Sequence, residues 1–304
     1  MEGPEALSVF QAAHEAGDLK LRVVMQIPSE NLDHALALGL RTGLGDDMLR
    51  IGHVKMFADG SLGSQTAWML APYDGSAGDL GVSTMPPGDL EEAVRRASDA
   101  GIGCAIHAIG DRAVREVLDI LERSGRGLRH RIEHAQIVDP RDVPRFARLG
   151  VVASMQPIHA TSDRYMADRL WGIRCRHAYA WRSLLDAGAV LAFGSDCPVE
   201  TLDPLQGIYA ATARKRSDEP ESSPWYPEQA VTVEEALRGY TWGAAFACGQ
   251  ERSRGVLRPG MPADVTVISR DIASAPAELI LETTVEYTIV AGEVVFARTG
   301  GAGA

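Results

Sequence analysis

Lysine is scarce in this chain. Lys20, Lys55 and Lys215 are the only lysines among 30 basic residues, and 41 acidic residues give a formal net charge of −11. A protein that binds the nucleic-acid backbone or an anionic membrane surface needs a basic face. The composition therefore predicts neither a nucleic-acid partner nor a membrane partner.

Cysteine is also sparse, and long apolar runs are missing. The four cysteines lie far apart and form no CxxC pair, which excludes a disulfide framework and a structural zinc knuckle. No apolar run approaches the roughly 18 residues of a membrane span. The N-terminal segment MEGPEALSVFQAAHEAGD is acidic and lacks the pattern of a signal peptide. We therefore expect reduced thiols in a cytoplasmic protein.

Short apolar runs of strand length alternate with amphipathic segments that carry helix signals. An N-cap and a stop signal flank most of these segments, as in DLEE before Gly101 and in the Asp139-Pro140 helix start before Gly150. TVEE begins a last long helix that ends near Gly249. A repeated order of strand and helix predicts βα units and a parallel sheet. The predicted strands are 21–26, 51–58, 103–107, 130–134, 151–156 and 190–196.

Polar residues stand at the carboxyl ends of these predicted strands. In a barrel all such ends converge on one mouth, whereas in a doubly wound sheet only the strands near the switch point share a site. We therefore predict an incomplete (β/α)₈ TIM barrel over residues 1–254. After Gly255 the sequence pattern changes from alternating strands and helices to short strands. Residues 255–298 are therefore predicted to form a small β segment with a hairpin turn at Ala291-Gly292, and residues 299–304 a disordered tail.

Three of the strand-end residues suit a metal ion. Imidazole nitrogens of His107 and His134 and a carboxylate oxygen of Asp196 are suitable Zn²⁺ ligands, and an open coordination position leaves room for water. A nearby carboxylate can take the proton of that water. The alternative is structural: each histidine is a hydrogen-bonded strand end, and Asp196 is a turn former before Cys-Pro.

Lys55 interrupts an apolar run, where an unpaired ammonium is costly to bury. It is either an edge lysine that reaches solvent, a partner of a carboxylate, or a lysine carboxylated by CO₂ that bridges two metals. Asp59, Gln156 and His159 are candidates for substrate contact. Asp59 is alternatively an orienting or turn residue before glycine, and the other two are alternatively surface residues.

Six blocks in one order carry a family resemblance. They are HVKMFADGSLGSQTAWMLAPY (53–73), HAIGDRAV (107–114), RIEHAQIV (131–138), SMQPIHATSD (154–163), GSDCPVETLDPLQGI (194–208) and GVLRPGMPADVTVI (255–268). Together they closely resemble the metal-dependent amidohydrolases of the amidohydrolase-3 group, which includes YtcJ-like proteins and N-substituted formamide deformylases. The resemblance covers roughly residues 18–297.

This resemblance implies a (β/α)₈ barrel with a small β-sandwich and one or two divalent metal ions, usually zinc. It implies hydrolysis of non-peptide C–N bonds in a small-molecule amide substrate. Lys55 matches the strand-four lysine, which is carboxylated in binuclear members. His107 and His134 match the metal ligands of strands five and six, and Asp196 matches the strand-eight aspartate that binds metal and acts as general base.

One family motif is missing. The first metal ligands of the family form a His-x-His pair on strand one, and this sequence contains no HxH. Relative to the family, the chain is expected to hold about strands three to eight and the C-terminal part of the sandwich. The alternative to an active hydrolase is therefore an incomplete amidohydrolase fragment or a subunit that requires a partner. A barrel lyase or isomerase that uses the same metal is a third reading. Open sheet edges also favour a homo-oligomer.

Overall fold

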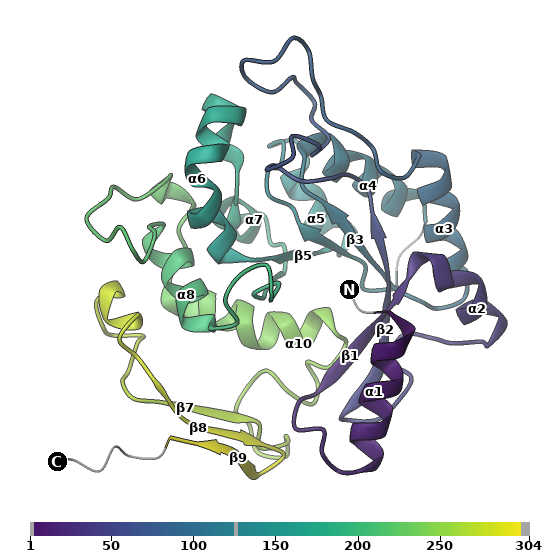
Figure 1. Ribbon diagram of the computed structural model, residues 1–304, viewed down its shortest axis with the longest axis vertical. Coiled ribbons are helices and arrows are strands. Elements are labelled where there is room, and N and C mark those ends of the chain that lie inside the picture. The colour runs from purple at the N-terminus through teal and green to yellow at the C-terminus, as the bar shows by residue number, and fades with distance from the viewer. Residues whose placement is uncertain (1–2, 125–126, 299–304) are drawn as a thin grey trace.

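The computed structural model describes residues 3–124 and 127–298, which form two sheets with helices around them (Figure 1). A parallel sheet has the strand order β1-β2-β3-β4-β5-β6, and an antiparallel sheet has the order β7-β8-β9. The strands are β1 (Val23–Pro28), β2 (Leu49–Phe57), β3 (Cys104–Ala108), β4 (Arg131–His134), β5 (Val152–Met155), β6 (Leu191–Phe193), β7 (Val265–Ile268), β8 (Val285–Val290) and β9 (Glu293–Ala297).

Helices fill most connections between the parallel strands. Helices α2, α3 and α4 pack against β1, β3 and one another. The α-helices are α1 (Pro4–Glu15), α2 (Leu32–Ala37), α3 (Pro87–Asp99), α4 (Asp111–Arg123), α5 (Val143–Leu149), α6 (Pro157–Trp171), α7 (Trp181–Asp186), α8 (Pro204–Ala213), α9 (Val233–Arg238) and α10 (Ala244–Ala247). Shorter helical turns are η1 (Ser29–Asn31), η2 (Gly172–His177), η3 (Pro227–Gln229), η4 (Gly239–Gly243) and η5 (Ala277–Ile280).

The prediction of an incomplete α/β barrel is confirmed. All six predicted parallel strands are present, in the predicted order, with boundaries shifted by a few residues. Within the described residues, β1 and β6 each pair with a single neighbouring strand, so the sheet has two open edges. No helix among these residues has the length and apolar character that a membrane span requires.

The helix signals were right in part. Thr232 and Glu235 form the predicted capping box of α9, and the helix continues through the π-helical turn η4 into α10. The predicted helix start at Asp139-Pro140 is wrong, because the Asp139 carboxylate accepts the backbone N–H of Arg141 in a turn and α5 begins later. Helices α1, α2, α6 and α8 were not predicted.

The small sheet lies beneath α8 and α10 in the view of Figure 1. Its hairpin between β8 and β9 turns at Ala291 (φ 52°) and Gly292 (φ 87°), and this pair of left-handed residues fits a two-residue turn. Arg22, just before β1, binds both carboxylate oxygens of Asp264 at 2.8 Å and ties this sheet to the barrel. The boundary at 254/255 stays a prediction, and the tail predicted at 299–304 lies outside the described residues.

A buried arginine links α8 to the segments that lie beside α6. Arg214 is 1% exposed and donates to the carbonyl oxygens of Trp225, at 2.8 Å, and Tyr179, at 3.1 Å. Its guanidinium lies 4.6 Å from the ring centroid of Trp181 and 5.3 Å from that of Trp225. The Trp225 indole N–H in turn donates to Asp168 of α6 at 2.9 Å. Buried aromatic rings around a cation hold this wall together.

Candidate functional site

The predicted metal residues share one cavity at the carboxyl ends of the parallel strands. Lys55 of β2, His107 of β3, His134 of β4 and Asp196, which follows β6, all line a hollow of about 450 Å³. His159, at the start of α6, lines it too. The parallel sheet therefore brings together five residues that are up to 141 positions apart in sequence, as the barrel prediction required.

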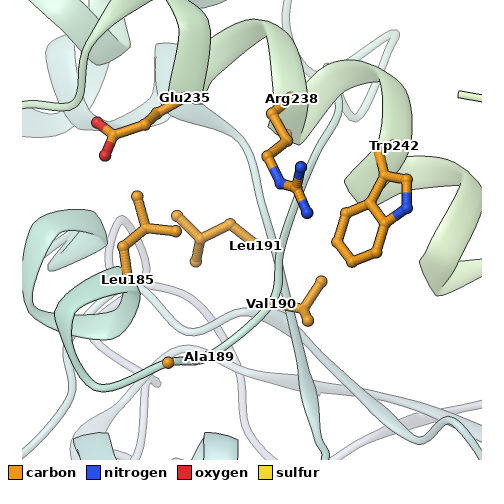
Figure 2. A pocket seen from close by; sticks show the side chains of 9 residues that line it. Leu185, Ala189, Val190, Leu191, Glu235, Arg238 and Trp242 are labelled. Carbon is orange, nitrogen blue, oxygen red and sulfur yellow. The ribbon is translucent and has the colours of Figure 1, made fainter. Parts of the chain in front are cut away.

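A second pocket lies at the opposite end of β6 (Figure 2). Its volume is about 210 Å³, and Val190 and Leu191 at the start of β6 line it. The charged residues there have structural partners: Glu235 binds Arg182, and the Arg238 guanidinium lies 4.1 Å from the Trp242 ring centroid. This pocket contains no predicted site residue, so the strand-end cavity is the candidate site.

His107 presents one ring nitrogen as an acceptor. Its Nε2 lies 2.8 Å from the Gly60 carbonyl oxygen, so Nε2 carries the proton and donates it. The neutral ring then leaves the Nδ1 lone pair for another ligand. Burial, and secondly the neighbouring His134, lower the pKa of His107 to about 3. The ring is therefore uncharged at neutral pH, as a metal ligand must be.

His134 has the complementary arrangement. Its Nδ1 donates to Oε1 of Gln156 at 2.9 Å, which leaves the Nε2 lone pair. Burial lowers the pKa of His134 to about 4. The rings of His107 and His134 meet edge to face with centroids 4.6 Å apart. A hydrogen bond that fixes the second ring nitrogen is the usual companion of a metal-binding histidine.

Asp59 lies behind His107 and does not line the cavity. Its carboxylate accepts the backbone N–H groups of Trp68 at 2.8 Å, Ile109 at 3.0 Å and Gly110 at 2.8 Å, and its Oδ1 is 3.5 Å from Nε2 of His107. Burial raises the pKa of Asp59 to about 7 although the three amides oppose this. The backbone of Gly110 lies so close to Trp68 that a Cβ atom at Gly110 would be 2.0 Å from the Trp68 carbonyl oxygen.

Asp59 and Gln156 thus occupy equivalent places, one behind each histidine. Gln156 is 7% exposed and, like Asp59, is not among the cavity-lining residues. The substrate contact expected of both stays a prediction, but their contacts are those of residues that position an imidazole.

Lys55 is inside the open barrel. Its Nζ lies 4.8 Å from the ring centroid of Phe57. Burial lowers the pKa of Lys55, while the carboxylates of Glu133 and Asp196 oppose the shift. Glu133 itself pairs with Arg131, with 2.6 Å between Oε1 and Nε. Lys55 therefore has acidic neighbours in the interior, but within the described residues no carboxylate lies within ion-pair distance of its ammonium, so the alternatives for Lys55 stay predictions.

Asp196 stands at the exposed rim of the cavity, in a left-handed conformation with φ 57°. His134 also has a positive φ, 73°. Non-glycine residues rarely adopt this region, and those that do gather at binding and catalytic sites. Two of the four predicted metal residues thus carry unusual backbone geometry at the ends of their strands.

The donor set fits a divalent metal in chemistry. The four predicted ligands that line the cavity offer two neutral imidazole lone pairs, one carboxylate and one lysine nitrogen. Among residues 3–124 and 127–298, however, no three or more His, Cys, Asp or Glu side chains are grouped closely enough to hold a metal ion. The assignment of Lys55, His107, His134 and Asp196 as metal ligands stays a prediction.

Of the far wall of the cavity, sequence reasoning identified only His159, as a candidate for substrate contact, and missed the other residues. His159, Asp163 and Met166 recur at i, i+4 and i+7 on α6, so one helix face points all three into the cavity. Gln136 and Glu200 complete this wall. The HATSD spacing of the SMQPIHATSD block was the available signal, because it places a carboxylate one helical turn from His159.

Comparison with known proteins identifies relatives over nearly the whole chain. The chain is 33% identical to the putative amidohydrolase YtcJ of Bacillus subtilis over 96% of this chain and 55% of that protein. It is 31% identical to the N-substituted formamide deformylase of Arthrobacter pascens over 83% of this chain and 47% of that protein. The chain therefore spans about half the length of these relatives.

A solved structure agrees. The crystal structure of an uncharacterized metal-dependent hydrolase from Pyrococcus horikoshii matches with a TM-score of 0.81 and 32% identity, over 90% of this chain and 55% of that one. The model of the amidohydrolase family matches residues 2–296. With the barrel sheet and the strand-end cavity in place, this match shows that the chain belongs to the amidohydrolase family.

Proposed function

We propose that this chain forms part of a zinc-dependent hydrolase that cleaves a non-peptide C–N bond in an amide, N-formyl or N-acyl compound. The observation that carries the proposal is the pair of neutral imidazoles, each with one nitrogen held by a hydrogen bond and the other without a partner within the described residues. The similarity to an N-substituted formamide deformylase and to a metal-dependent hydrolase supports it.

In this proposal Nδ1 of His107, Nε2 of His134, Asp196 and Lys55 would hold the metal. Zinc, when bound, activates a water molecule and polarises the scissile carbonyl. Asp196 accepts the proton of the attacking water and returns it to the leaving nitrogen, as its exposed place at the cavity rim allows. The C–N bond breaks, and the products are a carboxylate and an amine.

Lys55 decides between one and two metals. As an ammonium beside Glu133 and Asp196 it balances charge and leaves one metal on the histidines. Carboxylated by CO₂, it would be an anion whose oxygens could help to hold a second metal. Zinc stoichiometry distinguishes the two states, and a mass increase of Lys55 by one CO₂ identifies the second.

The test combines metal content with turnover. We expect about one or two equivalents of zinc after dialysis and zinc-dependent release of amine from N-formyl or N-acyl amides. Asp196→Asn removes the proton acceptor but keeps the fold, so its turnover should fall by about a thousandfold. An Asp196→Asn protein with full hydrolytic activity would contradict the mechanism.

A second candidate is a chain that is inactive until further barrel strands are supplied in trans. Two observations favour it: the open edges at β1 and β6, and the absence of a three-residue metal group among the described residues. It predicts weak zinc retention and activity only with a longer relative or a second polypeptide. The same edges lead us to propose a homo-oligomer, which sedimentation velocity tests. Steady hydrolysis by the chain alone excludes this candidate.

A further inference from the structure

The far wall of the cavity contains buried polar atoms without partners. His159 is 7% exposed, and neither of its ring nitrogens has a hydrogen-bond partner within the described residues. Gln136 is 5% exposed, and its Oε1 is likewise unpartnered. Both residues line the cavity. Buried polar atoms in proteins almost always have partners, so these atoms point to a ligand.

Asp163 adds a carboxylate to the same wall. Its Oδ2 accepts the Tyr179 hydroxyl at 2.7 Å and the Gln136 amide at 3.5 Å. In the described part of the chain, no lysine, arginine or histidine nitrogen lies within ion-pair distance of either oxygen. Burial raises the pKa of Asp163, although the Tyr179 hydrogen bond and nearby His159 oppose this, and Glu200 adds to the rise. A half-buried carboxylate of this kind lacks its counter-charge.

The charge of the lining indicates the ligand class. Asp163 and Glu200 face the cavity on this side, whereas among the described residues Lys55, on the near side, is the only lysine or arginine that lines it. The unpartnered Gln136 Oε1 accepts and cannot donate. Leu62, Met166 and Val199 supply apolar surface in the same cavity. An aliphatic segment that ends in several N–H donors and a positive charge matches this wall.

We infer that His159, Gln136, Asp163 and Glu200 form a subsite for a primary ammonium group, so that the substrate is an amide joined by a short aliphatic chain to a cationic amine. This inference rests on the proposed function for the reacting end of the substrate. It adds the chemistry of the other end, and it makes the four residues determinants of specificity. An ammonium there would donate to Gln136 Oε1 and to the carboxylates, which are acceptors.

Three formamides of equal length test the subsite by binding. Mono-N-formyl-1,4-diaminobutane carries the ammonium, N-formylpentylamine replaces it with a methyl group, and 5-formamidopentanoate replaces it with a carboxylate. Calorimetric titration of the 304-residue chain, with and without added zinc, measures each affinity. We expect the ammonium compound to bind at least about tenfold more tightly than the methyl compound, and the carboxylate compound to bind most weakly.

Charge-removing variants locate the effect. Asp163→Asn and Glu200→Gln should each lower the affinity for the ammonium compound about tenfold and leave the methyl compound unchanged. Asp18→Asn makes the same kind of change at an exposed position and should alter nothing. Glu200→Gln keeps the test valid if Asp163→Asn fails to fold, because Asp163 anchors Tyr179 whereas Glu200 makes no hydrogen bond within the described residues.

The outcomes separate this inference from the proposed function. An ammonium compound that binds no better than its methyl counterpart, or variants that leave its affinity unchanged, would overturn the subsite. If the ammonium preference is present while zinc-dependent turnover of every formamide is absent, the subsite stands and the hydrolase proposal fails. If zinc-dependent turnover of a formamide is present while the ammonium preference is absent, the hydrolase proposal stands and the subsite fails.

Discussion

The cavity has two walls that differ in how their histidines are held. The near wall is formed by the predicted metal residues Lys55, His107, His134 and Asp196, and the far wall by the residues around His159 on α6. On the near wall, His107 and His134 each have one nitrogen fixed by a hydrogen bond at 2.8–2.9 Å. On the far wall, His159 stacks on His134 with a centroid distance of 6.0 Å but has no hydrogen-bond partner within the described residues. Contacts within the protein therefore orient the near-wall histidines, whereas His159 on the far wall would gain its hydrogen bonds from a bound ligand. Each unpartnered buried group costs about 1–3 kcal/mol, which a fitting ligand recovers.

Acid should have the largest effect, because it acts on the neutral histidines. His53, His107, His130 and His134 are buried with pKa values lowered to between about 3 and about 4, chiefly by burial. Below the unfolded pKa of about 6.5 the unfolded chain binds more protons than the folded one, so stability present above that pH is lost as the pH falls. Asp59, whose pKa is raised to about 7, acts in the opposite direction.

Summed over these groups, the free energy of unfolding should fall by roughly 5 kcal/mol between pH 7.5 and pH 5. Urea unfolding at several pH values measures it. His130→Gln removes one such histidine outside the cavity and should reduce the slope below pH 6.5 by about 1.4 kcal/mol per pH unit. A stability that is constant or rises toward pH 5 would contradict the buried neutral state of the four rings.

Removal of one near-wall imidazole should have the next largest effect. His134→Ala deletes a predicted ligand, so retained zinc should fall to near zero and turnover by about a thousandfold. His34→Ala, at an exposed position on α2, is the matched control and should keep both. The measurements are elemental analysis and amine release. Full zinc retention by His134→Ala would contradict the assignment of the metal site to the near wall.

A smaller effect is expected behind His107. Asp59→Asn places an amide among three backbone N–H donors, loosens the Gly60 segment and should lower zinc affinity by about 10- to 100-fold. Asp111→Asn is the control, because Asp111 is also buried and accepts one backbone N–H, from Leu70 at 2.7 Å, but does not line the cavity. Equal zinc affinities in the two variants, at comparable melting temperatures, would show that Asp59 has no positioning role.

The near wall could be predicted from the sequence, whereas His159 was the one far-wall residue that was predicted, and this difference has a physical reason. His107, His134 and Asp196 end apolar runs and Lys55 interrupts one near its end, and the carboxyl ends of parallel strands meet at one edge. That local pattern sufficed to bring them together. The far wall depends on α6, a helix that is buried around much of its circumference and therefore lacks a clear apolar stripe. Its contacts with Gln136 and Tyr179 are long-range and have no local signature.

The fold shows the same division. Strand order and the hairpin at Ala291-Gly292 follow from periodicity and turn chemistry, which are local properties. The start of α5 was misplaced because the Asp139 side chain forms a local turn that competes with a helix N-cap. For Asp59, the sequence could show a carboxylate before glycine, but the three amide donors come from segments up to 51 residues away.

The arginine between Trp181 and Trp225 gives the protein an optical property. Indole emission depends on nearby charge and on hydrogen bonding at Nε1, and Trp225 has the Arg214 guanidinium near its ring and Asp168 of α6 at its Nε1. The helix that carries Asp168 also carries His159 and Asp163. A shift of α6 therefore changes the surroundings of Trp225. The wavelength and intensity of tryptophan emission then report the position of this helix without an added label.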